Sequence, residues 1–283
     1  MTAIKKIFSE SDMTAFEPTE KVGIVACINP EGLPHITLIT TMQAGNPEQL
    51  LLGEFSKGLS KQYIQENRNI AFLIMTLDRR LWRGKAEWTS LSHSGPEYDM
   101  LNNKPMFRYN TYFGINTVHY LDLVEVTEPE PLAMGKIILA AIKTMISKGR
   151  ASTRMRDIIL PGFGQDIFNG LDSLKFISYI GDDGFPVIIP LIQCQAADSR
   201  RLAFSRGVYD EELIKIPVGA TVAVFGMTMK MEDILVRGTF RGFRRYMGIE
   251  LGTVDINWVY NSMPPAHGQI YPEVEIEPVS VFE

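Results

Sequence analysis

The feature that most constrains the fold of this chain is an internal repeat about half as long as the chain itself. A shift of 152 positions places the segment from Val22, VGIVACINPEGLPHITLI, on the segment from Leu174, LKFISYIGDDGFPVIIPL. The same shift places the segment from Asn69, NIAFLIMT, on the segment from Thr221, TVAVFGMT. Because two separated blocks share one shift, the sequence predicts a tandem duplication of one structural unit.

A further match between the halves lies slightly out of phase. The letters FSKG at Phe55–Gly58 match FSRG at Phe204–Gly207, with a shift of 149. A three-residue length change that is later reversed would reconcile this shift with the main one. The sequence therefore predicts that residues 205–206 of the second unit correspond to residues 56–57 of the first.

Composition and charge exclude several classes of protein. Of the 283 residues, 45% are hydrophobic and 22% are charged, which is typical of a globular chain and not of a disordered or collagen-like one. The net charge of −5 gives no global attraction to nucleic acid or to anionic membranes. No apolar stretch reaches the ~18 residues of a membrane span, and the N-terminus lacks the apolar core of a signal peptide. We expect no nucleic-acid or membrane partner.

The cysteines and histidines indicate neither a disulfide scaffold nor a metal site. Cys27 and Cys194 both lie inside apolar runs, and neither belongs to a CxxC pair. The four histidines are scattered, so no zinc-ligand spacing is present. Buried free thiols are typical of a reducing compartment, and the sequence therefore predicts a cytoplasmic protein without a metal.

Each repeat unit is predicted to consist mostly of strands. In the first unit the turn cluster 29–32 separates strands over 22–28 and 35–42, and a short helix that begins near Ser56 precedes two more strands. Many short strands with few helices favour a closed barrel over a parallel sheet. The expected strands are 22–28, 35–42, 50–55, 70–75, 81–88 and 118–126, then 174–180, 187–194, 201–205, 221–227, 235–243 and 248–259, with short helices at 56–66 and 209–214.

A helix is expected between the two units. Apolar residues over 132–148 recur at helical spacing, and Lys148-Gly149-Arg150 ends the pattern. Residues 90–117 form an insertion, rich in aromatic and amide side chains, that the second unit lacks. We therefore predict a first domain over 1–150, which includes the insertion 90–117 and the connecting helix, and a second domain over 151–283.

The order of these elements resembles the FMN-binding split-barrel family of pyridoxamine 5′-phosphate oxidase. The resemblance covers more of the first unit than of the second, and the order of the segments is more specific than any single one. It is carried by Gly32-Leu33-Pro34, Phe55-Ser56-Lys57-Gly58, Ser60-Lys61, Asn67-Arg68-Asn69-Ile70-Ala71 and Arg83-Gly84-Lys85-Ala86.

This resemblance implies a mainly β (α+β) fold with two tandem split β-barrels that form an internal pseudo-dimer. Members of the family usually bind FMN between two barrels, and FMN is therefore the implied cofactor. The family's phosphate clamp is a Ser-Arg-Lys type run at a helix start, which here corresponds to Leu59-Ser60-Lys61 with Ser60 in the Arg position. The second unit instead carries acidic residues at 210–212, which favours one flavin site per chain.

The residues at the strand-to-helix junction fit the chemistry of a phosphate site. Ser56, Lys57, Ser60 and Lys61 supply hydroxyl and ammonium donors where a helix N-terminus adds free N–H groups. The alternative is a capped and solvated surface helix. We take these four residues as candidate FMN-phosphate ligands.

Further candidates lie on the neighbouring strands and in the insertion. Thr40 is a donor for the flavin ring or ribityl chain, although threonine is also a common strand former. Arg83 and Lys85 alternate on one strand face, which either meets the flavin or is solvated. From the insertion, Arg108, Tyr109 and Asn110 complete the set, since an Arg with aromatics and amides suits a pocket wall and equally an apolar plug.

Together these expectations favour an FMN-dependent oxidoreductase that acts on a small molecule. No side chain stands out as a catalytic acid or base, so the catalytic residues are unknown. The alternative is a non-catalytic haem- or flavin-binding sensor of the same fold, for which His119 or His35 would be the axial ligand of a haem. The expected partners are a small-molecule substrate or electron donor, and the chain is expected to be a monomer or a homodimer.

Overall fold

The computed structural model describes residues 3–55, 58–104, 114–155, 157–261 and 268–274. It divides into two compact units. The first unit comprises Met1–Leu132 and the segment Ile180–Ile188, and the second comprises Ala133–Tyr179 and Ile189–Glu283. Each unit is built on one sheet, so the chain is mainly β with two tandem split-barrel units, as predicted.

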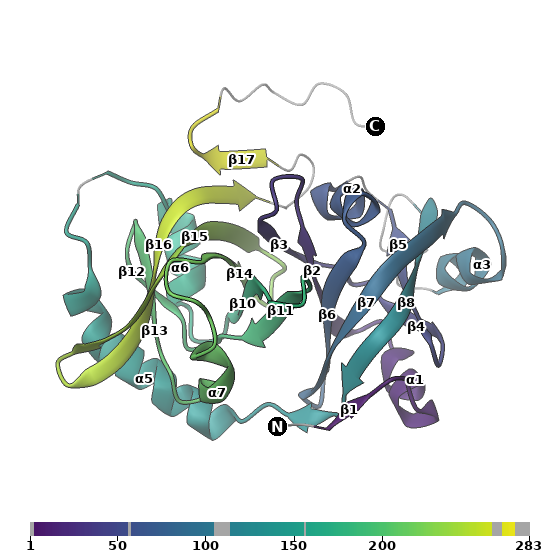
Figure 1. The fold of residues 1–283 in the computed structure, drawn as a ribbon, viewed down its shortest axis with the longest axis horizontal. Coiled ribbons are helices and arrows are strands. Elements are labelled where there is room, and N and C mark those ends of the chain that lie inside the picture. The colour runs from purple at the N-terminus through teal and green to yellow at the C-terminus, as the bar shows by residue number, and fades with distance from the viewer. Residues whose placement is uncertain (1–2, 56–57, 105–113, 156, 262–267, 275–283) are drawn as a thin grey trace. The chain divides into compact units, whose positions relative to one another are not determined.

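The first sheet is antiparallel and is accompanied by three described helices (Figure 1). The helices are α1 (Glu10–Phe16), α2 (Leu59–Glu66) and α3 (Pro96–Asn103). The strands are β1 (Ile4–Lys5), β2 (Lys21–Ile28), β3 (Pro34–Leu38), β4 (Gln43–Asn46), β5 (Gln49–Glu54), β6 (Asn69–Thr76), β7 (Arg80–Ser92), β8 (Thr117–Thr127) and β9 (Glu130–Pro131). They are hydrogen-bonded in the order β3-β2-β6-β7-β8-β5-β4, with β1 on β8 and β9 on β7.

The second sheet repeats this topology. Its helices are α5 (Met134–Ala151), α6 (Gly162–Asn169) and α7 (Asp210–Leu213). Its strands are β10 (Leu174–Ile180), β11 (Pro186–Pro190), β12 (Gln195–Asp198), β13 (Arg201–Ser205), β14 (Thr221–Met227), β15 (Asp233–Tyr246), β16 (Ile249–Asn261) and β17 (Gly268–Tyr271). The order β11-β10-β14-β15-β16-β13-β12 matches the first sheet strand for strand, and β17 is added on β16.

The duplication extends to the register of individual residue pairs. Val22 pairs with Met75, and Leu174 pairs with Met227, so both partners are shifted by 152. Both sheets also carry a bulge at the same place, between Lys85 and Ala86 in β7 and, at the shift of 152, between Arg237 and Gly238 in β15. A shared bulge indicates that the two units descend from one fold, because a bulge sets where a strand bends.

The hairpin turns of the two units are also equivalent. The N–H of Gly32 donates to the carbonyl of Asn29 at 2.9 Å, and the N–H of Gly184 donates to the carbonyl of Gly181 at 3.0 Å. The φ angles of Gly32 and Gly184 are +76° and +79°, in the left-handed region that favours glycine. This conformational demand explains why both turns carry a glycine at the shifted position.

The predicted length change before the second helix is wrong. Gln43 pairs with Leu51, and Gln195 pairs with Ala203, so the shift of 152 persists through β13. The starts of β5 and β6, Gln49 and Asn69, and the starts of β13 and β14, Arg201 and Thr221, are related by the same shift of 152, so no insertion is needed. Arg206 therefore corresponds to Glu54, and the match of FSRG with FSKG has no structural counterpart.

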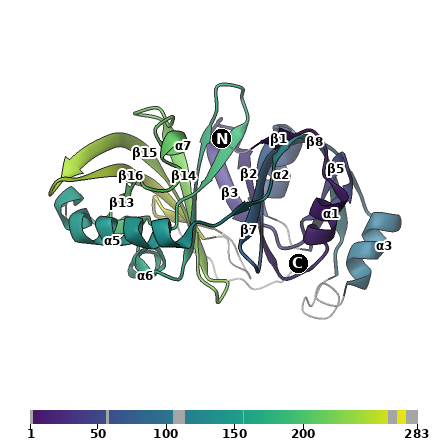
Figure 2. The same cartoon turned by 90° about the horizontal axis from the view of Figure 1, so that it is seen from below.

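The sequence predicts the connecting helix in a first domain that ends at residue 150, whereas the structure groups this helix, α5, with the second unit. It packs there on β12, β13 and β16. Polar contacts fix it in place, since the N–H of Ser205 donates to Oγ1 of Thr144 at 2.9 Å and Nε2 of Gln195 donates to the carbonyl of Ala141 at 3.0 Å. Figure 2 shows α5 running along the second sheet. Its opposite face is apolar and exposed, with Ile138, Leu139, Ile142, Met145 and Ile146.

The interior of each unit is apolar. In the first unit a cluster that includes Phe16, Phe72 and Trp82 fills the space inside the sheet, and the rings of Phe16 and Trp82 lie 5.1 Å apart edge to face. Cys27 and Cys194 are both buried and carry free thiols, as predicted. Burial raises the pKa of Cys194 to about 12. None of the described helices is long and apolar enough to cross a membrane.

Candidate functional site

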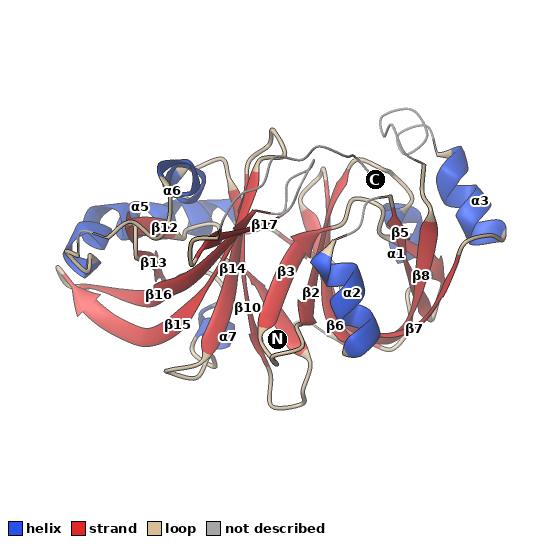
Figure 3. Ribbon diagram, turned by 90° about the horizontal axis from the view of Figure 1, so that it is seen from above, coloured by secondary structure: helices blue, strands red, loops and turns tan. Residues whose placement is uncertain are grey.

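The start of α2 offers hydrogen-bond donors that no side chain of its cap uses. Gly58 is the N-cap residue, with extended backbone (φ −154°), and the cap makes no side-chain hydrogen bond. The first N–H groups of a helix have no partner within the helix, and together with the helix dipole they favour an anion at this end. Figure 3 shows α2 as a distinct helix beside strands β2, β3 and β6.

Lys61 brings its ammonium group back to this helix end. Its Nζ lies 3.7 Å from the position that a Cβ on Gly58 would take, and 5.9 Å from the ring centroid of Phe55. Burial lowers the pKa of Lys61, and the nearby carboxylate of Glu54 opposes that effect. Ser60, the preceding residue, is also buried. The Lys61 ammonium thus lies close to the first turn of α2.

A hydrogen-bonded polar chain of three side chains, Trp88, His119 and Glu54, ends at Glu54, the last residue of β5 before α2. Nε1 of Trp88 donates to Nδ1 of His119 at 3.1 Å, and Nε2 of His119 lies 2.9 Å from Oε2 of Glu54. The His119 side chain is fully buried, and that of Glu54 is 13% exposed. Since the indole N–H is a donor only, Nδ1 of His119 accepts its hydrogen bond. The hydrogen of the imidazole is then on Nε2, which donates a hydrogen bond to Oε2 of Glu54. The chain links β7, β8 and β5.

The structure does not describe several of the predicted ligands. Ser56 and Lys57 lie outside the described residues, as do Arg108, Tyr109 and Asn110 of the insertion. Thr40 lies in the turn after β3 and is partly buried. Its neighbour Thr41 makes the buried contact, because its Oγ1 donates to the carbonyl of Gly53 at 2.6 Å.

Arg83 and Lys85 do share one face of β7, as predicted, and each is already paired with a carboxylate. Arg83 Nη2 lies 2.9 Å from Glu130 Oε1. Lys85 Nζ lies 2.8 Å from Glu125 Oε1 and 2.7 Å from Oδ2 of Asp183, which belongs to the segment grouped with the first unit. Burial opposes these pairings, but the two carboxylates still raise the pKa of Lys85. An anion on this face would compete with these carboxylates.

The corresponding helix of the second unit lacks the lysine, is shorter and begins with acidic residues. At the shift of 152, Gly58, Ser60 and Lys61 become Asp210, Glu212 and Leu213. Helix α7 covers only Asp210–Leu213, and its first turn is acidic.

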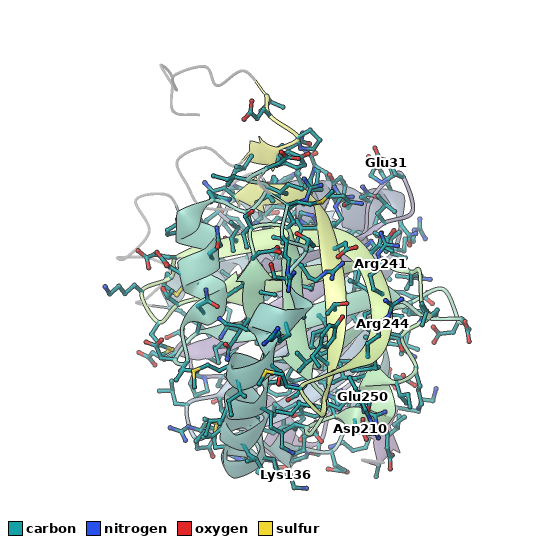
Figure 4. The ribbon with its side chains drawn as sticks, turned by 90° about the vertical axis from the view of Figure 1, so that its left-hand side faces the viewer. Glu31, Lys136, Asp210, Arg241, Arg244 and Glu250 are labelled. Carbon is teal, nitrogen blue, oxygen red and sulfur yellow. The ribbon has the colours of Figure 1, made fainter. Side chains whose placement is uncertain are left out.

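An arginine beside α7 is neutralised from two sides. Arg206 Nε lies 3.0 Å from Asp210 Oδ1, and its Nη2 lies 2.6 Å from Glu250 Oε2. Figure 4 labels Asp210 and Glu250, which lie near one another on this face of the second unit. The place that faces the Lys61 ammonium in the first unit is thus taken in the second by a carboxylate of the protein itself.

The rings of His119 and His35, the two candidate haem ligands, both contact other side chains of the protein. Both ring nitrogens of His119 are engaged, as described above. His35 is 3% exposed, and its ring packs edge to face on Tyr63 with centroids 5.3 Å apart. Over the described part of the chain, no group of three or more His, Cys, Asp or Glu side chains is arranged to hold a metal ion.

Sequence reasoning missed Glu54 and the partners of its carboxylate. The signal was present in the alternation of β5, where Leu50 and Leu52 face the interior and Glu54 is the next residue on that face. In β8, His119 and Leu121 share the interior face in the same way. A charged or polar residue that continues a buried face indicates a partner on the neighbouring strand.

Comparison with known proteins finds similarity at the level of solved structures. No family model and no curated protein matches the chain. An FMN-binding protein from Syntrophomonas wolfei is 14% identical, with a TM-score of 0.34, and the match covers 39% of this chain and 77% of that one. A putative pyridoxamine 5′-phosphate oxidase from Lactobacillus delbrueckii is 18% identical, with a TM-score of 0.35 and coverage of 44% and 96%. An FAD-binding protein from Mesorhizobium loti is 10% identical, with a TM-score of 0.31 and coverage of 46% and 99%.

Proposed function

We propose that the first unit binds FMN by its phosphate at the start of α2, and that the protein is a cytoplasmic FMN-dependent oxidoreductase acting on a small molecule. The observation that carries this proposal is the position of the Lys61 ammonium, folded back over Gly58 at a helix end that has no side-chain cap. FMN is the phosphate-bearing cofactor that the sequence resemblance implies for this junction.

The residues present fit a phosphate group. A phosphate monoester needs several donors and positive charge in one place, which a helix N-terminus with a lysine supplies. Among the described residues other than its neighbours in the chain, only Lys61 lies within 4 Å of the position that a Cβ on residue 58 would take, whereas in the second unit Asp210 stands at that position. Ser56 and Lys57 are candidate ligands next to it in the chain, and Thr40, Arg108, Tyr109 and Asn110 remain candidates for the rest of the flavin.

Arg83 and Lys85 are weaker candidates, since Glu130, Glu125 and Asp183 already neutralise them. The second unit lacks the lysine, and its helix α7 begins with acidic residues. Both differences support one FMN per chain. A bound FMN would supply the electron or hydride transfer, while the chain supplies binding, orientation and electrostatics. No side chain is assigned as an acid or base.

Flavin titration tests the proposal directly. The purified protein is examined for a flavin absorbance spectrum, and the flavin-free protein is then titrated with FMN, FAD and riboflavin by fluorescence quenching. We expect one FMN per chain, bound more tightly than riboflavin. Absence of flavin in the preparation and of binding at micromolar FMN would overturn the proposal. Turnover with a reduced nicotinamide then separates an enzyme from a non-catalytic flavin sensor, and a Soret band would indicate the haem alternative.

A further inference from the structure

The polar chain of Trp88, His119 and Glu54 has no counterpart in the second unit. The strand registers equate Trp88 with Phe240, His119 with Gly252 and Glu54 with Arg206. These equivalences follow because Leu52 pairs with His119 and Phe204 pairs with Gly252, while Trp88 and Phe240 pair with the equivalent residues Leu121 and Val254. The two units therefore share the backbone but not these side chains.

Aromatic rings fill the corresponding space in the second unit. A Cβ on Gly252 would lie 2.8 Å from ring atoms of both Phe204 and Phe243. The rings of Phe204, Phe240 and Phe243 contact one another, with centroids 5.5 to 6.1 Å apart. Because the same fold is completed with phenylalanines, the barrel itself does not require the buried histidine and its two partners.

The place of the polar chain in the first unit indicates what it serves. Glu54 is the last residue of β5, Phe55 follows it, and Lys61 Nζ lies 5.9 Å from the Phe55 ring centroid. The lysine, which is partly buried, is replaced by the apolar Leu213 in the second unit, where the polar chain is also missing. The carboxylate and the ammonium thus occur together in one unit and are absent together from the corresponding positions of the other.

We propose that Trp88, His119 and Glu54 are positioning residues: they orient the Glu54 carboxylate so that it favours the charged form of Lys61 at the start of α2. Trp88 fixes the tautomer of His119, His119 fixes the Glu54 carboxylate, and the carboxylate retains the proton on Lys61 against the cost of burial. This inference rests on the proposed function, because a charged Lys61 matters for an anion such as the FMN phosphate.

Other titratable groups lie on the strands that pack against α2. The helix packs on β2 and β3, which contribute the thiol of Cys27 and the ring of His35. Burial raises the pKa of Cys27, so this thiol is neutral and does not retain a proton on a lysine. The Glu54 carboxylate, in contrast, favours the charged form of Lys61.

The first test needs no flavin. The flavin-free protein is labelled with an amine-reactive ester from pH 6 to pH 10, and modification of Lys61 is followed by mass spectrometry of its peptide. The neutral amine reacts, so we expect Lys61 in the Glu54→Gln variant to react about 3- to 10-fold faster at pH 7 than in the wild type. Glu66→Gln, an exposed change on the same helix, is the matched control and should react like the wild type.

The second test uses the ratio of FMN to riboflavin affinity, because only FMN carries the phosphate. In Glu54→Gln we expect FMN binding to decline at lower pH than in the wild type, while riboflavin binding changes less than about 2-fold. Trp88→Phe should shift the FMN profile in the same direction by less. This second variant keeps the test valid if Glu54→Gln folds poorly, since the second unit tolerates phenylalanine at the same position.

The outcomes separate the two proposals. If the wild type binds no FMN, the proposed function fails, while the labelling result still decides the role of Glu54. If the wild type prefers FMN but both variants keep the wild-type labelling rate and pH profile, the positioning role is overturned and the polar chain is structural.

Discussion

Nε1 of Trp82 donates a hydrogen bond to Oδ1 of Asp12 at 2.9 Å, across seventy residues of chain and inside the first unit. Asp12 is 2% exposed and also accepts from the N–H of Ser9, with which it forms the capping box of α1. Its other oxygen lies 2.6 Å from Nζ of Lys5. One carboxylate therefore joins the N-terminal segment, a helix start and the core tryptophan.

Asp12→Asn should lower the free energy of unfolding by about 2–3 kcal/mol at pH 7, because charge-assisted hydrogen bonds and a partly buried ion pair are lost. Burial opposes ionisation of Asp12, but Lys5, Ser9 and Trp82 still lower its pKa. The stabilisation is present above the unfolded-state pKa and is lost as the pH falls through the folded-state value. Urea unfolding at pH 7 and at pH 3 should show the difference between the two proteins shrinking in acid.

Asp78→Asn is a matched control for this prediction. Asp78 pairs with Arg80 at 2.7 Å, but both side chains are at least half exposed. Exposed ion pairs contribute little to stability. No measurable change is expected for this variant, and an equal loss in both variants would contradict the role assigned to Asp12.

Ser60→Ala combined with Lys61→Ala should weaken FMN binding more than Arg206→Ala does. The double variant removes a buried hydroxyl and the ammonium beside Gly58, whereas Arg206 is neutralised by Asp210 and Glu250. Loss of one charge-assisted contact to phosphate is worth about 1.5–3 kcal/mol, or a rise in the dissociation constant of about 10- to 150-fold. Fluorescence titration measures both variants, and equal losses would show that the two units do not differ as proposed.

The duplicated fold is predictable from the sequence because its strong signals are local. The turn at Gly32 and its counterpart Gly184 require a left-handed backbone, and the branched residues around them predict strands. The short strands β4 and β12 are not visible in this way. Each has four residues, and β12 includes the sequence QAAD, so pairing with the neighbouring strand and not intrinsic preference defines it.

The candidate site is less predictable, because its essential relations connect distant strands. The position of Lys61 beside the start of its own helix follows from the sequence, since both lie within four residues. The contact of His119 with Glu54 depends on the pairing of β8 with β5, and that of Trp88 with His119 depends on the pairing of β7 with β8. The four-letter match of FSRG with FSKG also led to a wrong correspondence of Arg206 with Lys57. The strand register instead equates Arg206 with Glu54, because register and not letter identity fixes which residues correspond.

Gly252→Ala should destabilise the second unit by about 1–3 kcal/mol, the usual cost of overpacking a filled core. The new methyl group would lie 2.8 Å from ring atoms of Phe204 and Phe243. Gly149→Ala in α5 is the control, because nothing lies within 4 Å of its Cβ position and alanine favours a helix. Thermal unfolding should show a lower midpoint for the first variant and an unchanged or higher one for the second.

Lys175 provides a prediction at alkaline pH. Its side chain is fully buried in the second unit, and its Nζ donates to the carbonyls of Gly170 and Ile192. Burial lowers the pKa of Lys175 to about 8 from the ordinary value of 10.5. Between these two values the unfolded chain binds more protons than the folded one, so the contribution of Lys175 to stability rises with pH.

The unfolding free energy of the wild type minus that of Lys175→Met should therefore increase by about 3 kcal/mol from pH 8 to pH 10.5. Burial also raises the pKa of the Cys194 thiol, so this thiol lowers stability over part of the same range. Both proteins retain Cys194, and most of its effect cancels in the difference. Urea unfolding at pH 8, 9, 10 and 10.5 measures that difference, and a value that stays constant over the range would show that Lys175 remains protonated inside the folded protein.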